Sequence, residues 1–413
     1  MRQDRPRVIH LTTVASSLTK LLLPQLVAFR EAGYDVIGVS APGPEVAELE
    51  DAGIRHVALR GSTRAANLRA DLTAAKDFIR ICRRLKPDIV HTHNPKPGVY
   101  GRIGARLAGV PIVVNTVHGL YAQPTDPLRK RAVVYALERL AATCSDAELL
   151  QNVEDLPVLL RLRVPRERLF VLGNGIDLER FDPEHHADAR EATRRALGVS
   201  DEEVLVGTVG RLVYEKGYRE LFEAAAEVRR QRPEVRFVTI GPEDPDKADA
   251  VTAADLARAR EAGVTFLGQR DDVESLYAAM DVFVLPSHRE GFPRAAMEAA
   301  AMGLPIVATD VRGCRQVVDH GRTGLLVPPY TPRELASAIR RLAENADFRH
   351  TLGSAGYTRA RVEFVQYRQI ELTTAVYDAL TNVTGWRESR GAPWVWPDSR
   401  VRQQLPFRAR SGR

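Results

Sequence analysis

Short apolar runs alternate with helical segments along this chain, and the alternation starts twice. In the first half, the apolar runs lie at 7–11, 35–40, 54–59, 88–93, 111–114 and 169–172. The second series lies at 204–210, 235–240, 264–267, 281–285, 304–308 and 324–327. Strands that alternate with helices are typical of parallel sheets covered on both faces. The sequence therefore predicts an α/β fold with two Rossmann-like, doubly wound domains.

A turn-rich stretch at 173–177 (GNGID) separates the two series and predicts a domain boundary. We expect an N-terminal domain at 1–175 and a C-terminal domain at 176–365. A trailing helix at about 366–384 is assigned to the first domain. This helix is expected to be part of one long helical stretch at 347–380. Two domains of similar size predict a cleft between them, which is a favoured place for a ligand.

The last segment, residues 385–413, carries most of the charge of the chain. It has seven arginines against Glu388 and Asp398, which is 7 − 2 = +5 of a total net charge of +6. The preceding residues are nearly neutral and carry no nucleic-acid-binding motif, so nucleic acid is not expected as a partner. The segment also contains Trp386, Trp394 and Trp396. We expect it to be disordered or, alternatively, to contact a bilayer interface.

No apolar run approaches the ~18 residues that a membrane span needs, and the charged N-terminus does not resemble a secretory signal. Cys82, Cys144 and Cys314 are far apart, as expected for small buried side chains in a reducing compartment. We therefore expect a cytoplasmic protein. The helix expected at 18–32 is apolar with Lys20 near its start. It is either a core helix or a peripheral contact with the inner face of the cell membrane.

Two acidic residues, Glu290 and Glu298, follow the apolar run at 281–285. Pro293 is expected to be the first residue of a helix, because its missing N–H group would be unpaired there anyway. Open parallel sheets bind ligands at the carboxyl ends of their strands, and helix starts favour anionic or oxygen-rich groups. The two carboxylates could therefore hold a polyhydroxylated molecule. The alternative is that both are solvated surface residues.

Arg211 and Lys216 lie on the loop that follows the first strand of the second series, GRLVYEKG at 210–217. Two cations placed in this way can bind one diphosphate, the arginine as a fork and the lysine as a point charge. Fixed positive charge at this point would lower the barrier for the loss of a diphosphate leaving group. The loop is not a Walker motif, which requires GxxxxGK followed by Ser or Thr.

Polar residues also end strands in the first half. His118 follows the run at 111–114 and could hydrogen-bond a sugar hydroxyl or the reacting centre, or it could be structural. His91 and His93 could form a metal pair, but no third ligand is evident in the sequence. Lys96 on the same loop is interpreted as a ligand for phosphate or for an acceptor. Ser16, after the first strand, is a further candidate for acceptor binding.

Asp244-Pro245-Asp246 has the superficial form of an Asp-x-Asp metal motif. Because it lies in a proline-rich loop, we interpret it as a solvated turn. No metal site is therefore expected anywhere in the chain.

Four motifs occur in the order and spacing of the family 4 glycosyltransferases. They are NGID at 174–177, GRL at 210–212 with EKG at 215–217, Glu290 with Glu298, and GLLV at 324–327. Over roughly residues 7–380, the chain resembles these enzymes. The resemblance implies the GT-B fold, in which two Rossmann-like domains face each other across a cleft. It also implies a retaining, metal-independent reaction with a nucleotide-sugar co-substrate, UDP-linked, and no cofactor.

The same resemblance implies how the donor is held. Arg211 and Lys216 would bind its diphosphate, and Glu298 would bind its ribose hydroxyls. The backbone amides of Phe292 and Arg294 would contact the sugar. Pro293, however, stands where the family usually has glycine, and it removes one donor.

For the chemical step, the resemblance implies that Glu290 binds hydroxyls of the donor sugar and that His118 lies near the transferred sugar. The leaving diphosphate would help to deprotonate the acceptor. Glu290 is therefore not expected to act as a nucleophile, unlike a carboxylate of retaining glycosidases.

Within the family, four segments resemble enzymes that extend undecaprenyl-diphosphate-linked sugars in cell-surface polysaccharide assembly. These segments are 10–13, 22–26, 91–98 and 309–313. A lipid-linked or other glycan acceptor is implied, and Arg312 or Lys96 could meet its diphosphate. The alternatives are a sugar-nucleotide epimerase on the same fold, or a non-enzymatic membrane-binding protein.

Overall fold

The computed structural model describes residues 6–65, 67–122, 126–245 and 247–383. The chain forms two compact units. Unit 1 contains the described residues up to Gly173 and those from Tyr367 onward, and unit 2 runs from Asn174 to Gln366. The segment 385–413, for which disorder or bilayer contact is expected, lies outside the described residues.

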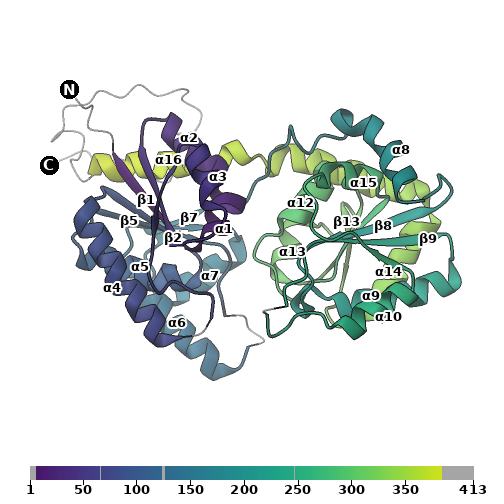
Figure 1. The fold of residues 1–413 in the computed structure, drawn as a ribbon, viewed down its shortest axis with the longest axis horizontal. Helices are drawn as coiled ribbons and strands as arrows, with labels where there is room; N and C mark the ends of the chain where they lie inside the picture. The colour runs from purple at the N-terminus through teal and green to yellow at the C-terminus, as the bar shows by residue number, and fades with distance from the viewer. Residues whose placement is uncertain (1–5, 66, 123–125, 246, 384–413) are drawn as a thin grey trace. The chain divides into compact units, whose positions relative to one another are not determined.

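Unit 1 is built on a seven-stranded parallel sheet in the order β3-β2-β1-β4-β5-β6-β7 (Figure 1). The strands are β1 Arg7–Val14, β2 Asp35–Ala41, β3 Arg55–Ala58, β4 Ile89–His93, β5 Ile112–Val117, β6 Ala147–Leu150 and β7 Leu169–Val171. The helices are α1 Ala15–Ser17, α2 Leu23–Glu31, α3 Val46–Asp51, α4 Leu68–Leu85, α5 Pro95–Leu107, α6 Leu128–Ala142, α7 Leu156–Arg161 and α16 Gln366–Val383. A π-helical turn, Leu18–Leu22, joins α1 to α2.

Unit 2 repeats this topology in a six-stranded parallel sheet with the order β10-β9-β8-β11-β12-β13. The strands are β8 Val204–Val209, β9 Val235–Ile240, β10 Val264–Phe266, β11 Val282–Leu285, β12 Ile306–Thr309 and β13 Gly324–Val327. The helices are α8 Ala187–Ala196, α9 Tyr218–Gln231, α10 Ala253–Glu261, α11 Val273–Ala279, α12 Arg294–Ala301, α13 Arg312–Val317, α14 Pro332–Glu344 and α15 Ala346–Glu363. Two doubly wound domains were predicted, and the structure confirms this fold class.

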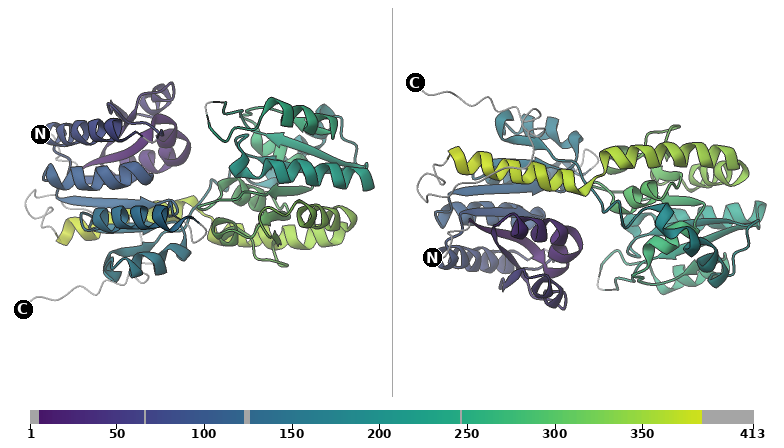
Figure 2. Two further views of the ribbon diagram at one scale, coloured as in Figure 1. Left: turned by 90° about the horizontal axis from the view of Figure 1, so that it is seen from below. Right: turned by 90° about the horizontal axis from the view of Figure 1, so that it is seen from above.

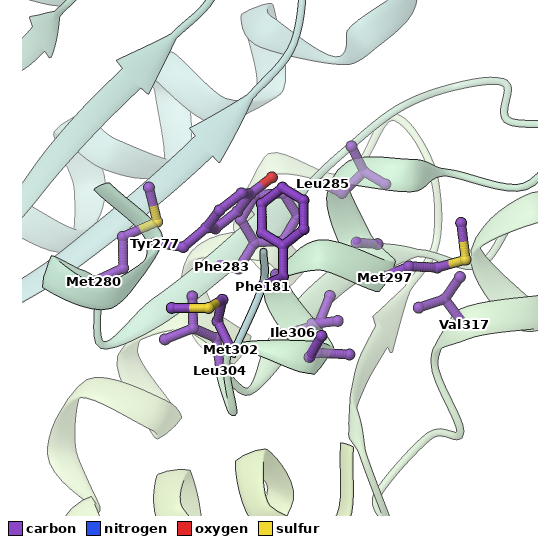
Figure 3. Close-up of a cluster of buried hydrophobic side chains, with 14 of the residues drawn as sticks. Phe181, Tyr277, Met280, Phe283, Leu285, Met297, Met302, Leu304, Ile306 and Val317 are labelled. Carbon is purple, nitrogen blue, oxygen red and sulfur yellow. The ribbon is translucent and has the colours of Figure 1, made fainter. Parts of the chain in front are cut away.

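Each sheet buries apolar side chains on both faces, because successive residues of a strand point to opposite sides. In β11, Val282 and Val284 enter one core cluster, while Phe283 and Leu285 enter the other. Figure 3 shows the second of these clusters, where Tyr277 of α11 packs against Phe283 at 5.7 Å between ring centroids. The strands of both units are therefore held from two sides.

The strand order reverses between β1 and β4 in unit 1 and between β8 and β11 in unit 2. Parallel sheets of this kind bind ligands outside the carboxyl ends of the strands at such a switch point. The loops after these four strands are therefore the places where a site is expected in each unit.

The single helical stretch predicted at 347–380 is wrong. Helix α15 ends at Glu363 and α16 begins at Gln366. Between them the backbone of Ile176 donates to Phe364 O at 2.9 Å and accepts from Gln366 N at 3.2 Å. This pairing with a distant segment takes the hydrogen bonds that would have continued the helix. Helix α16 then lies against unit 1 (yellow in Figure 2), where Val376 and Tyr377 join its core.

The apolar helix expected at 18–32 is a core element. Its large side chains at Leu18, Leu22, Leu26 and Phe29 are buried in unit 1. This burial favours the core interpretation of that helix over membrane contact. None of the helices in the described residues is both long and apolar enough to cross a bilayer.

Candidate functional site

The switch point of unit 2 brings together a lysine and a glutamate that lie on different loops. Lys216 Nζ lies 2.6 Å from Glu290 Oε1. Lys216 lies on the loop after β8, and Glu290 lies on the loop after β11. Glu290 is 9% exposed, so this ion pair is largely screened from water, where it is stronger than on an open surface.

Close backbone packing holds these two loops together. Gly217 has φ +75°, and a Cβ atom there would lie 2.0 Å from the carbonyl oxygen of Pro286. The amide of His288 also donates to Glu215 O at 2.8 Å. Only glycine fits at 217, both for its positive φ and for this approach. The lysine and the glutamate are thus positioned by the backbone as well as by their own attraction.

Arg211 has a different acidic partner. Its Nη1 atom lies 2.6 Å from Asp244 Oδ2, on the loop after β9. Asp244 lies in a loop with its side chain 25% exposed, as a solvated turn predicts, but its carboxylate is also bound by Arg211. Asp246, the other aspartate of that motif, lies outside the described residues. Arg211 and Lys216 share one loop, as predicted, but each is paired with a separate carboxylate.

Helix α12 carries Glu298, whose side chain is only 13% exposed. Tyr277 Oη donates to Glu298 Oε2 at 3.1 Å, and Arg294 Nε lies 3.8 Å from Glu298 Oε1. Burial raises the pKa of the Glu298 carboxyl above its usual range, although the Arg294 guanidinium opposes this effect. Pro293 precedes the helix as its N-cap rather than being its first residue, because its ψ of 112° is extended.

Two further contacts support the loop that carries Glu290. Asn174 Nδ2 donates to the carbonyl oxygen of Phe292 at 3.2 Å, and the Phe292 ring packs edge-on against Phe364. A Cβ atom at Gly313 would lie 2.6 Å from the Glu290 backbone, so α13 begins in contact with this loop. Arg312, a predicted acceptor ligand, is the first residue of α13. The motif that contains Asn174 could be recognised in the sequence, but the role of Asn174 in holding the Glu290 loop could not.

The switch point of unit 1 contains a chain of hydrogen-bonded histidines. His10 Nδ1 lies 3.1 Å from His93 Nε2, and His93 Nδ1 lies 3.1 Å from His118 Nε2. Burial lowers the pKa of His118 to about 4, opposed by a hydrogen bond with Gln151, and burial lowers the pKa of His10 to about 3. The imidazoles of this chain are therefore neutral near pH 7, and each can donate one hydrogen bond and accept another.

His10, His91 and His93 each offer a ring nitrogen, and these atoms lie within 4.8 Å of one another. His10 is thus a third potential metal ligand beside His91 and His93, and the sequence alone did not reveal it. However, both nitrogens of His91 are engaged, with Tyr377 Oη at 2.5 Å and Thr116 Oγ1 at 2.7 Å. The His91 and His93 rings also stack at 4.2 Å, so their lone pairs do not converge on one point. This geometry favours a hydrogen-bonded cluster over a metal centre.

The other predicted residues of unit 1 lie after β1 and β4. Lys96 Nζ pairs with Asp71 Oδ1 at 2.8 Å, and the Ser16 hydroxyl accepts from Arg64 Nη2 at 3.4 Å. Asn94, between His93 and Lys96, has φ +69°, which is uncommon for a residue other than glycine and recurs at functional loops. The structure thus places Ser16, Lys96 and His118 in unit 1 and the remaining predicted site residues in unit 2.

Each unit thus has a Rossmann-type switch point lined with polar residues, an arrangement typical of two-domain enzymes that bind ligands at the carboxyl ends of parallel strands. Residues 25–180 match the family described as Glycosyltransferase Family 4, and residues 189–359 match Glycosyl transferases group 1. An Escherichia coli relative, UDP-Gal:alpha-D-GlcNAc-diphosphoundecaprenol alpha-1,3-galactosyltransferase, is 30% identical over 77% of this chain and 82% of its own length. The chain belongs to the family 4 glycosyltransferases.

Other relatives agree with this assignment. The capsular polysaccharide biosynthesis glycosyltransferase CapM of Staphylococcus aureus is 28% identical over 87% of this chain and 93% of its own length. Among solved structures, Anabaena HepE in complex with UDP and glucose has a TM-score of 0.75 at 21% identity, covering 91% of this chain and 100% of that one. WaaG, involved in lipopolysaccharide biosynthesis, has a TM-score of 0.71 at 18% identity over 92% and 100% of the two chains. These structures show the GT-B fold.

Proposed function

We propose that this glycosyltransferase moves a sugar from a UDP-linked donor to a lipid-linked sugar acceptor, with retention of the anomeric configuration. The observation that carries the proposal is the Lys216–Glu290 pair at the switch point of unit 2. The names of two relatives support the choice of acceptor. The E. coli enzyme acts on a GlcNAc-diphosphoundecaprenol, and a Campylobacter jejuni relative acts on a bacillosaminyl-diphospho-undecaprenol.

In the proposed donor site, the diphosphate replaces carboxylates as the partner of the two cations. Lys216 is paired with Glu290, and Arg211 is paired with Asp244. A bound diphosphate carries more negative charge than either carboxylate, so it competes for both cations. When Lys216 turns to the diphosphate, Glu290 becomes available to accept hydrogen bonds from sugar hydroxyls. Glu298 accepts from the ribose, and the amides of Phe292 and Arg294 contact the sugar.

The same cations assist the reaction. The bond between the anomeric carbon and the diphosphate oxygen breaks, and negative charge develops on the leaving group beside Arg211 and Lys216. The acceptor hydroxyl attacks from the same face, and its proton passes to the leaving diphosphate, so the configuration is retained. The active form needs no metal ion or cofactor in this scheme.

On the acceptor side, His118 is proposed to contact the transferred sugar. A sugar hydroxyl would take the place of Gln151 as a hydrogen-bond partner of its neutral ring, and the His10–His93–His118 chain fixes the orientation of that ring. Ser16 and Lys96 in unit 1, and Arg312 in unit 2, are proposed to meet the acceptor and its diphosphate. The protein would then work in the cytoplasm at the inner face of the membrane.

The test is transfer with a defined acceptor. The full chain is incubated with undecaprenyl-diphosphate-linked N-acetylglucosamine and, one at a time, with a panel of UDP-sugars. Mass spectrometry should show the acceptor heavier by one sugar residue, and NMR should show an α linkage. A β linkage would contradict retention, and failure to transfer from any UDP-sugar would contradict the proposal. Without acceptor, an epimerised UDP-sugar would indicate epimerisation instead.

A further inference from the structure

Helix α6 of unit 1 turns its large aliphatic side chains toward solvent. Leu128 is 77% exposed, Val133 60%, Leu137 43% and Leu140 55%. Among residues of this helix, only the small Ala141 and Ala142 are buried. At 100° per residue, Val133, Leu137 and Leu140 fall on one side of the helix. The pattern is the reverse of an ordinary surface helix, whose aliphatic side packs inward.

The inward side of α6 is held by charge. Glu138 Oε1 pairs with Arg102 Nη2 of α5 at 2.8 Å, and the same guanidinium binds the buried Glu148 at 2.6 Å. Arg102 is fully buried, so its two carboxylate partners are needed to keep it there. Helix α6, at the edge of unit 1 in Figure 1, is therefore anchored through a polar contact that leaves its aliphatic side uncovered.

Basic residues accompany the exposed aliphatic residues. Arg129 and Arg139 are exposed on the same helix, and the segment 126–142 has a net charge of 4 − 2 = +2. Its two acidic residues already have cation partners, Asp126 with Lys130 at 2.8 Å and Glu138 with Arg102. Lys130 also lies over the ring of the exposed Tyr121, 5.0 Å from its centroid.

We infer that the outer face of α6, defined by Arg129, Val133, Leu137 and Leu140, docks on an anionic lipid bilayer. Helices that lie in a bilayer surface combine aliphatic side chains with arginine or lysine, and tyrosine is enriched at the same depth. The role of this docking, to bring unit 1 to a lipid-linked acceptor, rests on the proposed function.

This surface differs from the two membrane contacts considered from the sequence. The helix at 18–32 is buried in the core, and residues 385–413 lie outside the described part of the chain. A second copy of the chain is the competing occupant of the α6 face, and the experiment separates it from lipid.

Sedimentation of the full chain with vesicles of equimolar phosphatidylglycerol and phosphatidylcholine tests the inference. The variant Val133→Ser/Leu137→Ser/Leu140→Ser should lower the partition coefficient roughly tenfold or more. Leu68→Ser/Leu72→Ser is the matched control, because Leu68 is 75% and Leu72 54% exposed on α4 of the same unit. This control should bind like the unaltered chain. An equal loss of vesicle binding in both variants, or no loss of vesicle binding in the α6 variant, would overturn the inference.

A second variant tests the charge. Arg129→Gln/Arg139→Gln should weaken binding to the anionic vesicles severalfold and should reduce its dependence on salt. Unchanged binding and salt dependence would contradict anionic lipid as the partner. Sedimentation velocity without lipid addresses the competing occupant. A dimer that the triple serine variant converts to a monomer would assign the face to a second copy and overturn the inference.

UDP binding, measured in parallel, keeps this result separate from the proposed function. The serine variant changes unit 1 only, so its affinity for UDP should equal that of the unaltered chain. If the unaltered chain binds vesicles through α6 but does not bind UDP, the proposed function fails and the docking surface stands. If UDP binds normally and vesicles do not, the docking surface fails alone.

Discussion

Lys216 and Glu290 form a 2.6 Å ion pair across the switch point of unit 2, joining the loop after β8 to the loop after β11. Both residues were expected to bind the donor, one through its diphosphate and the other through its sugar. Their pairing adds a relationship that neither motif contains, because the charge of the lysine is balanced by a carboxylate of the same site. Under the proposed function, donor binding is an exchange of partners, and this exchange can be tested on each residue separately.

Glu290→Gln keeps the size of the side chain and removes its charge. Turnover should fall roughly ten- to hundredfold, because charge-assisted hydrogen bonds to sugar hydroxyls contribute about 1.5–3 kcal/mol. UDP affinity should be unchanged or higher, since Lys216 no longer has a competing carboxylate. Steady-state kinetics and calorimetric titration with UDP measure the two effects. Glu344→Gln, which alters an exposed pair with Arg232, is the matched control, and normal turnover in Glu290→Gln would refute the assigned role.

Lys216→Ala and Arg211→Ala should each weaken UDP binding by roughly 1.5–3 kcal/mol through loss of a charge-assisted contact. Uridine and UMP should be affected less than UDP, because the lost contact is to the diphosphate. Titration calorimetry with the three ligands makes this comparison. Arg232→Ala removes an exposed arginine of the same unit and controls for net charge. Equal losses for uridine and UDP would show that the loop, rather than the charge, had been damaged.

Much of the fold follows from patterns that are local in the sequence. The apolar runs locate most strands because a strand of a parallel sheet is buried on both faces. Loops after strands locate the candidate residues, since all carboxyl ends of a parallel sheet meet at one edge. This reasoning is enough to place Glu290, Arg211 and Lys216 together at the carboxyl edge of the second sheet.

The contacts that could not be predicted join segments far apart in the chain. His10 meets His93 only because β1 lies beside β4, and Asp244 meets Arg211 only because β9 lies beside β8. The break after Glu363 depends on Ile176, about 190 positions earlier. In helix α6, nothing in the composition shows that Glu138 rather than Leu137 points inward.

Glu298→Gln should weaken UDP binding through the ribose while leaving the fold intact, because the amide oxygen can still accept from Tyr277. Its effect on stability depends on pH. The folded pKa of Glu298 is raised by burial, so the folded state holds a proton that the unfolded state loses above its ordinary pKa of about 4.3. The native chain therefore loses stability as pH rises from about 4.3 to that raised pKa, and the variant does not. Thermal melting at pH 4 and pH 7 measures this effect. The melting temperature of Glu298→Gln relative to that of the native chain should be higher at pH 7 than at pH 4. The same difference at both pH values would contradict a raised pKa of Glu298 in the folded state.

Gly175→Ala should destabilise unit 2. A Cβ atom there would lie 2.6 Å from Gln366 Cα, where the 174–177 segment pairs with the break before α16. Overpacking against backbone typically costs about 1–3 kcal/mol. Gly356→Ala in α15 is the control, because its nearest neighbour would be at 3.7 Å, an ordinary contact. Urea unfolding should show a lower free energy of unfolding for Gly175→Ala than for the unaltered chain, and no decrease for Gly356→Ala. Equal stability of the two variants would contradict the close packing at Gly175.

Buried neutral histidines should make unit 1 sensitive to acid. Burial lowers the folded pKa of His118 to about 4, whereas an unfolded histidine titrates near 6.5. Between these values the unfolded state binds more protons, so the free energy of unfolding falls as the pH falls, by up to about 1.4 kcal/mol per pH unit for each such histidine. His118→Asn should reduce this slope when urea unfolding is compared at pH 7, 6 and 5. His350→Asn replaces an exposed histidine of α15 and serves as the control. The same slope in His118→Asn and in the unaltered chain would show that this ring is not held neutral by the fold.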